Sequence, residues 1–263
     1  MRSGLALDAW LGLFVIASGP FIGSFVSASA SSWPQYGNII SRRSRCAACG
    51  HMLGLAELIP ILSFIVQKGR CKACAAPIAR QHVMAELAST LIAVAAVLVF
   101  SGWMIPVSAL FGAVLLFIAL VDYRTRLIPD GATFGLVAGG LTLAFVLHGQ
   151  SGLKSALIGS VAGYGAFWLV AYLYRRLRGR EGLGLGDAKL LAAGGAWLGP
   201  LALPWVVLLA ASGTLVTVLL SRRGNLHRDT ALPFGPALAF AIYALWLWGG
   251  WHNSQAALLW SWP

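Results

Sequence analysis

The sequence predicts an all-α polytopic membrane protein with about eight transmembrane helices. Of its 263 residues, 59% are hydrophobic and only 10% are charged, whereas soluble domains carry roughly a quarter charged residues. A single soluble core of this size could not bury so much apolar surface. Runs such as residues 114–121 are apolar at every position, which excludes the alternating pattern of a transmembrane β-barrel.

Hydrophobic segments long enough to span a bilayer recur along the chain. They lie at residues 8–31, 84–100, 104–121, 131–147, 153–174, 188–203, 204–220 and 232–250. The sixth and seventh meet at Pro200 and Pro204, so this stretch is either one bent segment or two short spans. The first 30 residues lack the charge pattern and cleavage site of a signal peptide, so we interpret them as a retained span.

The distribution of basic residues predicts the topology. In a soluble chain, a net charge of +11 would suggest nucleic acid, but in a membrane protein it reports which loops face the cytoplasm. With eight spans, the loops at 32–83, 122–130, 175–187 and 221–231 share one side. These loops, with Lys189, hold all of the 19 Lys and Arg residues except Arg2 and Lys154. We therefore expect these loops in the cytoplasm, both termini outside, and no nucleic-acid partner.

Two further patterns have structural interpretations. The small residues of the SASASS run (27–32) are expected to pack against another helix, because no Lys or His lies nearby to activate a serine. Tryptophans near predicted helix ends are expected to form an interfacial aromatic belt. These are Trp103, Trp197, Trp205, Trp246, Trp248, Trp251, Trp260 and Trp262.

All four cysteines lie in residues 32–83, the only large extramembrane segment. They form two C-x2-C pairs, Cys46 with Cys49 and Cys71 with Cys74, separated by 21 residues. Four thiolates at this spacing can close a tetrahedron around Zn²⁺ with no position left for water, so the metal is expected to be structural. Two disulfides or a redox pair are disfavoured by the reducing cytoplasm and the lack of a thioredoxin-like context. His51 is a further candidate ligand, although a surface position suits it better.

Two carboxylates at the cytoplasmic ends of predicted spans are candidates for catalysis, because ionisable groups at membrane depth are costly. Asp122 ends the apolar run 117–122, where its charge opposes the helix dipole. Asp187 follows glycines at 182, 184 and 186, which permit close backbone approach. Two adjacent carboxylates that share a proton can hydrolyse a peptide without a covalent intermediate. Asp130, directly after Pro129, is interpreted instead as a helix N-cap, a role also open to Asp187.

These motifs resemble those of the type IV prepilin peptidases, membrane aspartyl proteases of the Gly-x-Gly-Asp class. The resemblance covers nearly the whole chain. It includes GSF (23–25), RSRCAACG, GRCKAC, PIARQHVMAELA (77–88), VDYRTRLIPD, GLGLGDAKLLAAGGAWLG and PFGPALA (233–239). It implies that Asp122 and Asp187 are the catalytic pair, with Gly184, Gly186 and Lys189 in the second aspartate motif. The implied substrates are prepilins or secretion pseudopilins at the bacterial inner membrane, cut after a Gly that ends a short basic leader.

Many members of this family also methylate the new amino terminus with S-adenosylmethionine, an activity attributed to the cytoplasmic loop region. The chain departs from the family pattern in that part. Ser27 and Ser32 stand near the places of an Asn and a basic residue, and Ala47 and Glu57 stand where Pro and Asn are common. The resemblance therefore implies peptidase activity and leaves methyl transfer open.

The expected organisation is a first transmembrane helix (1–31), a cytoplasmic four-cysteine zinc-binding domain (32–83), a membrane-embedded aspartyl peptidase domain (84–250) and a short extracytoplasmic tail (251–263). Two other function classes remain open. One is an ion-coupled transporter that uses the same carboxylates, and the other is a non-catalytic assembly factor that holds a partner through its zinc loop. The acids at one membrane face and the absence of an inverted repeat favour the peptidase. The sequence does not predict the oligomeric state.

Overall fold

The computed structural model describes residues 2–34, 44–46, 48–179, 184–221 and 233–253. Regular structure in these residues is helical, and β pairing is limited to two isolated antiparallel bridges, Arg45 with Met52 and Arg70 with Pro77. The chain divides into two compact units, Met1–Phe117 and Ile118–Pro263. The all-α prediction is confirmed.

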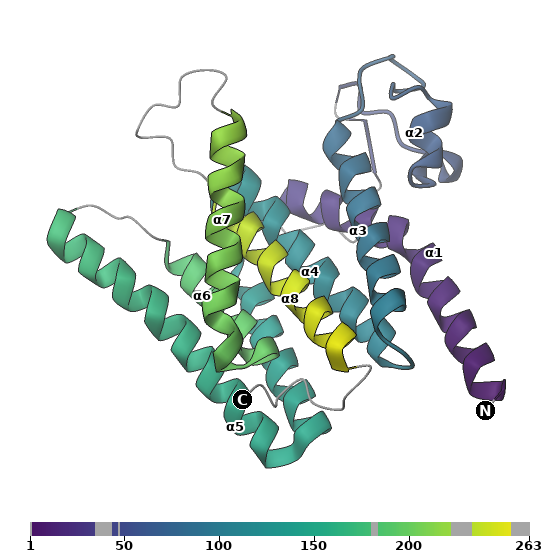
Figure 1. Cartoon of the computed structure of the whole chain (residues 1–263). Helices are drawn as coiled ribbons and strands as arrows, with labels where there is room; N and C mark the ends of the chain where they lie inside the picture. Colours follow the sequence, from purple (N-terminus) through teal and green to yellow (C-terminus); the bar gives the residue numbers. More distant parts are fainter. Residues whose placement is uncertain (1, 35–43, 47, 180–183, 222–232, 254–263) are drawn as a thin grey trace. The chain divides into compact units, whose positions relative to one another are not determined.

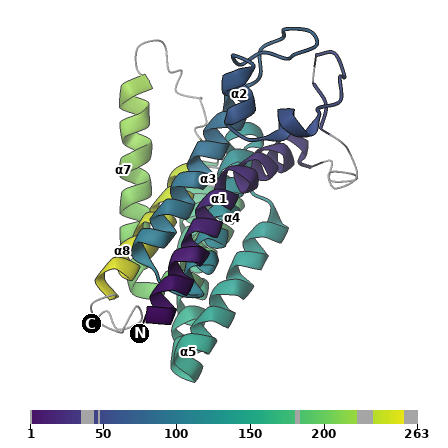
Figure 2. The same cartoon turned by 90° about the vertical axis from the view of Figure 1, so that its right-hand side faces the viewer.

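The first unit is built on a helix pair. Helix α1 (Arg2–Ser32) packs along α3 (Arg80–Val99), and the two run side by side (Figure 2). Glycines on one face of α1 permit this approach, because a Cβ on Gly23 would lie 2.5 Å from the Ala85 carbonyl oxygen. Ser27 is buried against α3, where its Oγ lies 2.8 Å from Nδ1 of His82. Helix packing by the small residues of 27–32 is confirmed for Ser27. The premise that no His lies near this run is wrong, because the fold brings His82, 55 positions away, to the Ser27 hydroxyl.

A small module lies between α1 and α3 in the sequence and beyond their ends in Figure 2. It contains a short 3-10 helix, η2 (Leu55–Leu58), and a short α2 (Leu62–Val66). The buried carboxylate of Glu86 on α3 accepts a 2.7 Å hydrogen bond from the backbone N–H of Ile61, directly before α2. Ile61 has φ of 61°, a strained conformation for a residue with a side chain. The hydrogen bond satisfies the backbone N–H at this turn and links the start of α2 to α3.

Helix α4 (Met104–Thr125) contributes to both units. Its first half adds Ile105 and Ala109 to the first unit's core. Helix α5 (Asp130–Arg178) then folds back on itself (Figure 1), because Gly149 has φ of 61° and ψ of −141°. It therefore supplies both the fourth and the fifth predicted spans.

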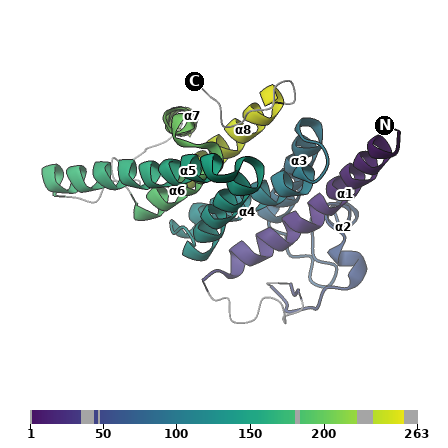
Figure 3. The same cartoon turned by 90° about the horizontal axis from the view of Figure 1, so that it is seen from below.

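The remaining helices complete the second unit. They are α6 (Leu185–Leu198), the 3-10 helix η3 (Pro200–Ala202), α7 (Leu203–Ser221) and α8 (Gly235–Asn253). Gly199 and Pro200 separate α6 from α7, so the sixth and seventh predicted segments are two helices rather than one bent span. Helices α5 and α6 lie side by side (Figure 3), with Gly159 on α5 against the backbone of Gly195 on α6.

Two tryptophans correct the prediction of an interfacial belt. Trp197 and Trp246 are buried and meet edge to face, with ring centroids 5.3 Å apart. The Trp197 indole N–H also donates a 2.7 Å hydrogen bond to the Leu136 carbonyl, which places this ring in the core between α6 and α5. Trp103, Trp205, Trp248 and Trp251 are exposed, whereas Trp260 and Trp262 lie outside the described residues.

The described helices support a membrane protein. Five have the length and composition to cross a membrane: Asp8–Ser32, Arg80–Val99, Met104–Thr125, Asp130–Arg178 and Pro200–Leu219. Large apolar side chains such as Phe14 and Leu98 are exposed, each by 71%, as expected where lipid is the solvent. With α5 counted as two, these five helices correspond to six of the eight predicted spans, and those at 188–203 and 232–250, in α6 and α8, are not among them. The predicted tail at 251–263 lies outside the described residues from position 254.

Candidate active site and cysteine cluster

Asp122 lies in the last turn of α4 and is only 6% exposed. Its backbone carbonyl accepts a 2.8 Å hydrogen bond from Arg126, whose φ of 57° turns the chain out of the helix. Its side-chain Oδ2 accepts a 3.0 Å hydrogen bond from the backbone N–H of Gly235, the first residue of α8. The carboxylate is therefore held inside the second unit rather than in solvent.

Asp187 lies in the first turn of α6 and is half-buried. Its backbone N–H donates a 3.1 Å hydrogen bond to Gly184, the extended residue from which the helix begins. Gly186 packs against Ile128 in the connection after α4, where a Cβ on Gly186 would lie 3.1 Å from that of Ile128. This contact brings the start of α6 to the segment that follows Asp122.

Asp122 and Asp187 lie within electrostatic range of each other. Both belong to the second unit, although they are on different helices. The structure therefore brings together the two carboxylates that the sequence marked as candidates. Two such groups can share a proton, so that one accepts a proton from water while the other donates one.

Lys189 and Asp130 form an ion pair that joins the first turns of α6 and α5, with Nζ 2.6 Å from Oδ1. The interpretation of Asp130 as an N-cap is wrong, because Pro129 occupies the cap position and Asp130 is the first residue within α5. The partner of Lys189 was not apparent from the sequence, since it is 59 positions away. Gly235 was also missed as a contact of Asp122, although a Pro-Phe-Gly-Pro turn before an apolar run is a signal for close backbone approach.

The four cysteines form a compact cluster in the first unit. Their Sγ atoms all lie within 4.8 Å of one another, and those of Cys46 and Cys74 are 3.9 Å apart. Zn–S bonds of about 2.3 Å place tetrahedral sulfur ligands about 3.8 Å apart, so these residues fit a Zn²⁺ ion. All four are free thiols rather than disulfides.

The two cysteine pairs repeat one backbone geometry. In the first, Cys46 N–H bonds to the His51 carbonyl, and Gly50 N–H bonds to the Cys46 carbonyl. The second shows the same two bonds, from Cys71 to Ala76 and from Ala75 to Cys71. Backbone hydrogen bonds from Cys49 and Ala48 also lower the pKa of the Cys46 thiol to about 6, and the thiolate is the form that binds metal. The structure thus presents four cysteines poised as ligands.

His51 does not join the thiol cluster. Its Nε2 lies 3.5 Å from Oε2 of Glu57, and its side chain is 42% exposed. The expectation of a surface histidine rather than a metal ligand agrees with this position. Glu57 also accepts a 2.8 Å hydrogen bond from the Gly54 N–H, which holds the pKa of its carboxyl below its usual value.

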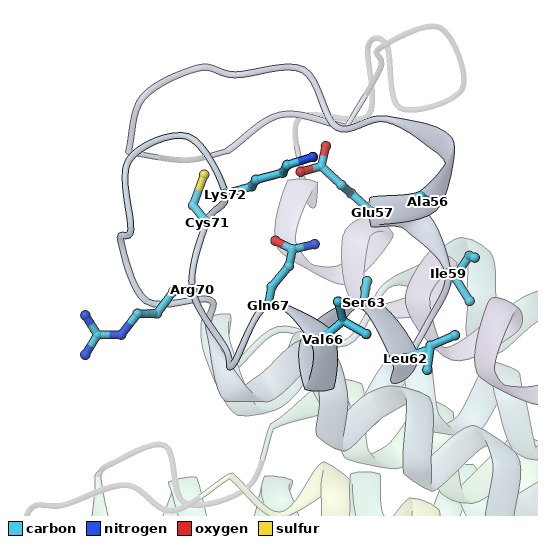
Figure 4. A pocket seen from close by; sticks show the side chains of 10 residues that line it. All are labelled: Ala56, Glu57, Ile59, Leu62, Ser63, Val66, Gln67, Arg70, Cys71 and Lys72. Atoms are coloured by element: carbon cyan, nitrogen blue, oxygen red, sulfur yellow. The ribbon is translucent and has the colours of Figure 1, made fainter.

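A cavity of about 480 Å³ adjoins this part of the module. The Lys72 side chain extends toward Glu57, and Gln67 lies below them (Figure 4). The second carboxylate oxygen of Glu57, Oε1, is buried and has no hydrogen-bond partner within the described part of the chain. The lining residues are Ala56, Glu57, Ile59, Leu62, Ser63, Val66, Gln67, Arg70, Cys71 and Lys72.

Comparison with known proteins relates the chain to membrane peptidases. The model of the bacterial peptidase A24 N-terminal domain matches residues 17–100, and that of the type IV leader peptidase family matches residues 109–220. A protein of Burkholderia pseudomallei named prepilin leader peptidase/N-methyltransferase is 41% identical over 88% of this chain and 73% of its own length. Proteins of the same name from Aeromonas hydrophila and Pseudomonas aeruginosa are 40% and 36% identical, over 82% and 81% of this chain and 74% and 73% of their own lengths.

No solved structure matches the chain. The two family models together span residues from the middle of α1 to the end of α7, including the cysteine cluster and both aspartates. The relatives are more than one-third identical over four-fifths or more of the chain. The chain therefore belongs to the type IV leader peptidase family.

Proposed function

We propose that the chain is an aspartic endopeptidase that cleaves the leaders of type IV prepilins or secretion pseudopilins, with Asp122 and Asp187 as its catalytic pair. The observation that carries this proposal is the buried Asp122 carboxylate within electrostatic range of Asp187. Membership in a leader peptidase family supplies the reaction class. It gives no support to an ion-coupled transporter.

The dyad hydrolyses the leader through a water held between the two side chains. One carboxylate removes a proton from the water while the water oxygen bonds to the scissile carbonyl carbon. The protonated partner donates its proton to the carbonyl oxygen. Collapse of this tetrahedral intermediate breaks the carbon–nitrogen bond as a proton passes to the leaving amine. The acid and base then return to their starting protonation states, so no covalent enzyme intermediate forms.

The direct test uses purified protein in detergent with a prepilin peptide that contains the leader and the start of the apolar segment. Asp122→Asn and Asp187→Asn each remove one proton-exchanging group with little change in shape. We expect cleavage to fall by at least about a thousandfold in each, since neither half of the dyad functions alone. Mass spectrometry of the leader product measures the loss. Full-rate cleavage by either folded variant would contradict the proposal.

The cysteine cluster is proposed to hold a structural Zn²⁺ ion through Cys46, Cys49, Cys71 and Cys74. When bound, the ion would cross-link the two knuckles and leave no position for water, so it would not take part in hydrolysis. The separations of the sulfur atoms support this assignment.

The relatives' names include an N-methyltransferase activity, and we propose that this chain uses S-adenosylmethionine in the cavity beside η2 and α2. The ligand combines a flat aromatic adenine, whose ring faces pack against apolar side chains, with hydroxyl and cationic groups. The cavity offers apolar Ile59, Leu62 and Val66 together with the carboxylate-bearing Glu57. Hydroxyl or cationic groups on the ligand would donate hydrogen bonds to that carboxylate.

Glu57→Gln tests the cavity, because it keeps the side-chain shape and removes the charge. We expect the affinity for S-adenosylmethionine to fall about tenfold or more, as expected for loss of a charged hydrogen-bond acceptor, while leader cleavage stays within about twofold of wild type. Isothermal titration with S-adenosylmethionine in the absence of peptide, and the peptide assay, measure the two effects. Val161→Ala, at an exposed position on α5 in the second unit, is the matched control. Unchanged affinity in Glu57→Gln would contradict this placement of the methyl donor.

The proposed location is the bacterial inner membrane, with the dyad and the cysteine module at the cytoplasmic face and both termini in the periplasm. The basic loops support this orientation, because the positive-inside rule places them in the cytoplasm. A reducing compartment also agrees with four free thiols.

A further inference from the structure

The N-terminus of α8 contacts Asp122 in a manner that the proposed chemistry alone does not require. Gly235 is buried, and its backbone N–H donates a 3.0 Å hydrogen bond to Oδ2 of Asp122. These residues are 113 positions apart, so the contact exists only because α8 packs against the end of α4. The bond commits one oxygen of the carboxylate to a fixed donor.

There is no room for a side chain at position 235 beside the Asp122 carboxylate. A Cβ at this position would lie 2.6 Å from Oδ2, 2.8 Å from Cγ and 3.1 Å from Cβ of Asp122. No Cβ is tolerated at such distances, so either the carboxylate or the helix would have to move. The glycine therefore contributes the N–H donor and, because it lacks a Cβ, the room for the carboxylate that accepts the bond.

Packing along α8 prevents the helix from retreating. Leu238 and Ile242 are fully buried, and the Ile242 side chain fills the space above Gly194 on α6. One turn further along, the buried Trp246 ring meets Trp197 of α6 edge to face. Helix α6 also carries Asp187. The contacts that fix α8 to α6 therefore also fix the position of the α8 N-terminus, and of Asp122 bonded to it, relative to Asp187.

We propose that Gly235 is a positioning residue for leader cleavage: it sets the orientation of the Asp122 carboxylate toward Asp187 through its N–H and its missing side chain. This inference rests on the proposed function, in which Asp122 is one half of the dyad. A displacement of about 1 Å at a catalytic group costs about a hundredfold in rate without a comparable loss of substrate binding. Gly235 therefore acts on the chemical step rather than on affinity.

The test compares two glycine variants of the second unit in the detergent assay with a prepilin peptide. Gly235→Ala is expected to lower kcat by about a hundredfold and to leave KM within about threefold. Gly165→Ala on α5 is the matched control, because its added Cβ would meet no atom within 4 Å. It is expected to retain kcat within about threefold. Thermal unfolding of both variants shows whether they remain folded.

A second variant removes the hydrogen bond and adds no atoms. Cell-free synthesis with glycolic acid at position 235 replaces the N–H by an ester oxygen, and kcat is expected to fall about tenfold at unchanged KM. This ester variant provides the test if Gly235→Ala is not recovered as a folded protein. Full kcat in either variant, a rise in KM that accounts for the whole loss, or an equal loss in Gly165→Ala overturns the inference. Failure of wild-type protein to cleave, or full cleavage by Asp122→Asn, would instead overturn the proposed function.

Discussion

The position of Asp122 is electrostatically unusual for a helix residue. A carboxylate in the last turn of a helix faces the negative end of the helix dipole, and α4 places Asp122 there. The first N–H of α8 offsets this by presenting the positive end of a second helix to the same carboxylate. The sequence indicated no structural benefit for Asp122 where it stands, and its own helix indeed gives none, but the structure adds a hydrogen bond from the distant α8.

The ion pair between Lys189 and Asp130 gives a prediction at the same scale. Both side chains are partly exposed, 29% and 58%, so removing the pair should change the free energy of unfolding by less than about 1 kcal/mol. Lys189 is nevertheless two residues from Asp187, and the pair fixes the first turn of α6 to that of α5. We expect Lys189→Asp to lower kcat for leader cleavage about tenfold.

The charge-swapped double variant decides how Lys189 acts. Lys189→Asp combined with Asp130→Lys restores the pair with reversed polarity, and we expect it to recover cleavage to within about threefold of wild type. A double-mutant cycle on kcat, with unfolding followed by circular dichroism, measures the coupling. No recovery would mean that Lys189 contacts the substrate or the dyad directly, against the positioning role assigned here.

At the scale of elements, periodicity and motifs could be read from the sequence, but pairings between helices could not. Continuous apolar runs predicted the long helices, and Pro200 indicated a bend or a break between the sixth and seventh segments, whereas the turn at Gly149 was not singled out. The position of the Trp197 indole between α6 and α5 was missed. An apolar aromatic near a helix end has the same local pattern whether lipid or another helix surrounds it, so only tertiary packing distinguishes the two.

The cysteine module gives a prediction for the element as a whole. A segment this small has too little core to fold without a cross-link. The dyad and Gly235, by contrast, belong to the second unit. Cys46→Ser combined with Cys74→Ser is therefore expected to abolish zinc binding, to make the chain at the exposed Arg70 and Lys72 cleavable by trypsin, and to leave kcat for leader cleavage within about threefold.

Metal analysis of the purified protein and limited proteolysis measure these effects. Wild type is expected to carry about one zinc ion per chain. His51→Ala is the matched control, because its ring pairs with Glu57 rather than with the thiols, and it should keep the metal. Retention of zinc in the double serine variant, or its loss in His51→Ala, would refute the four-thiolate assignment.

For the molecule as a whole, composition predicted the solvent, whereas the shape of the site needed coordinates. Hydropathy depends on each residue alone, so summing it over a window loses little. Asp122, Asp187 and Gly235 meet only because α4, α6 and α8 converge. Sequence patterns alone named the first two, since a carboxylate at membrane depth is costly wherever it lies. They could not name Gly235, whose role depends entirely on what approaches it.

Orientation in the membrane is the remaining property of the whole molecule, and α5 offers its own internal control. The segment from Ser151 to Arg178 is helical, and at 1.5 Å per residue such a helix is about 40 Å long, enough to cross the bilayer. Ser151→Cys and Arg178→Cys therefore place a thiol at each end of one span. In a variant with all four native cysteines replaced by serine, an impermeant maleimide added to intact spheroplasts should label position 151 alone. Permeabilisation should add labelling at 178. Labelling of 178 in intact spheroplasts would invert the topology and place the dyad on the side of the membrane opposite the leader, which would remove the basis for cleavage at the cytoplasmic face.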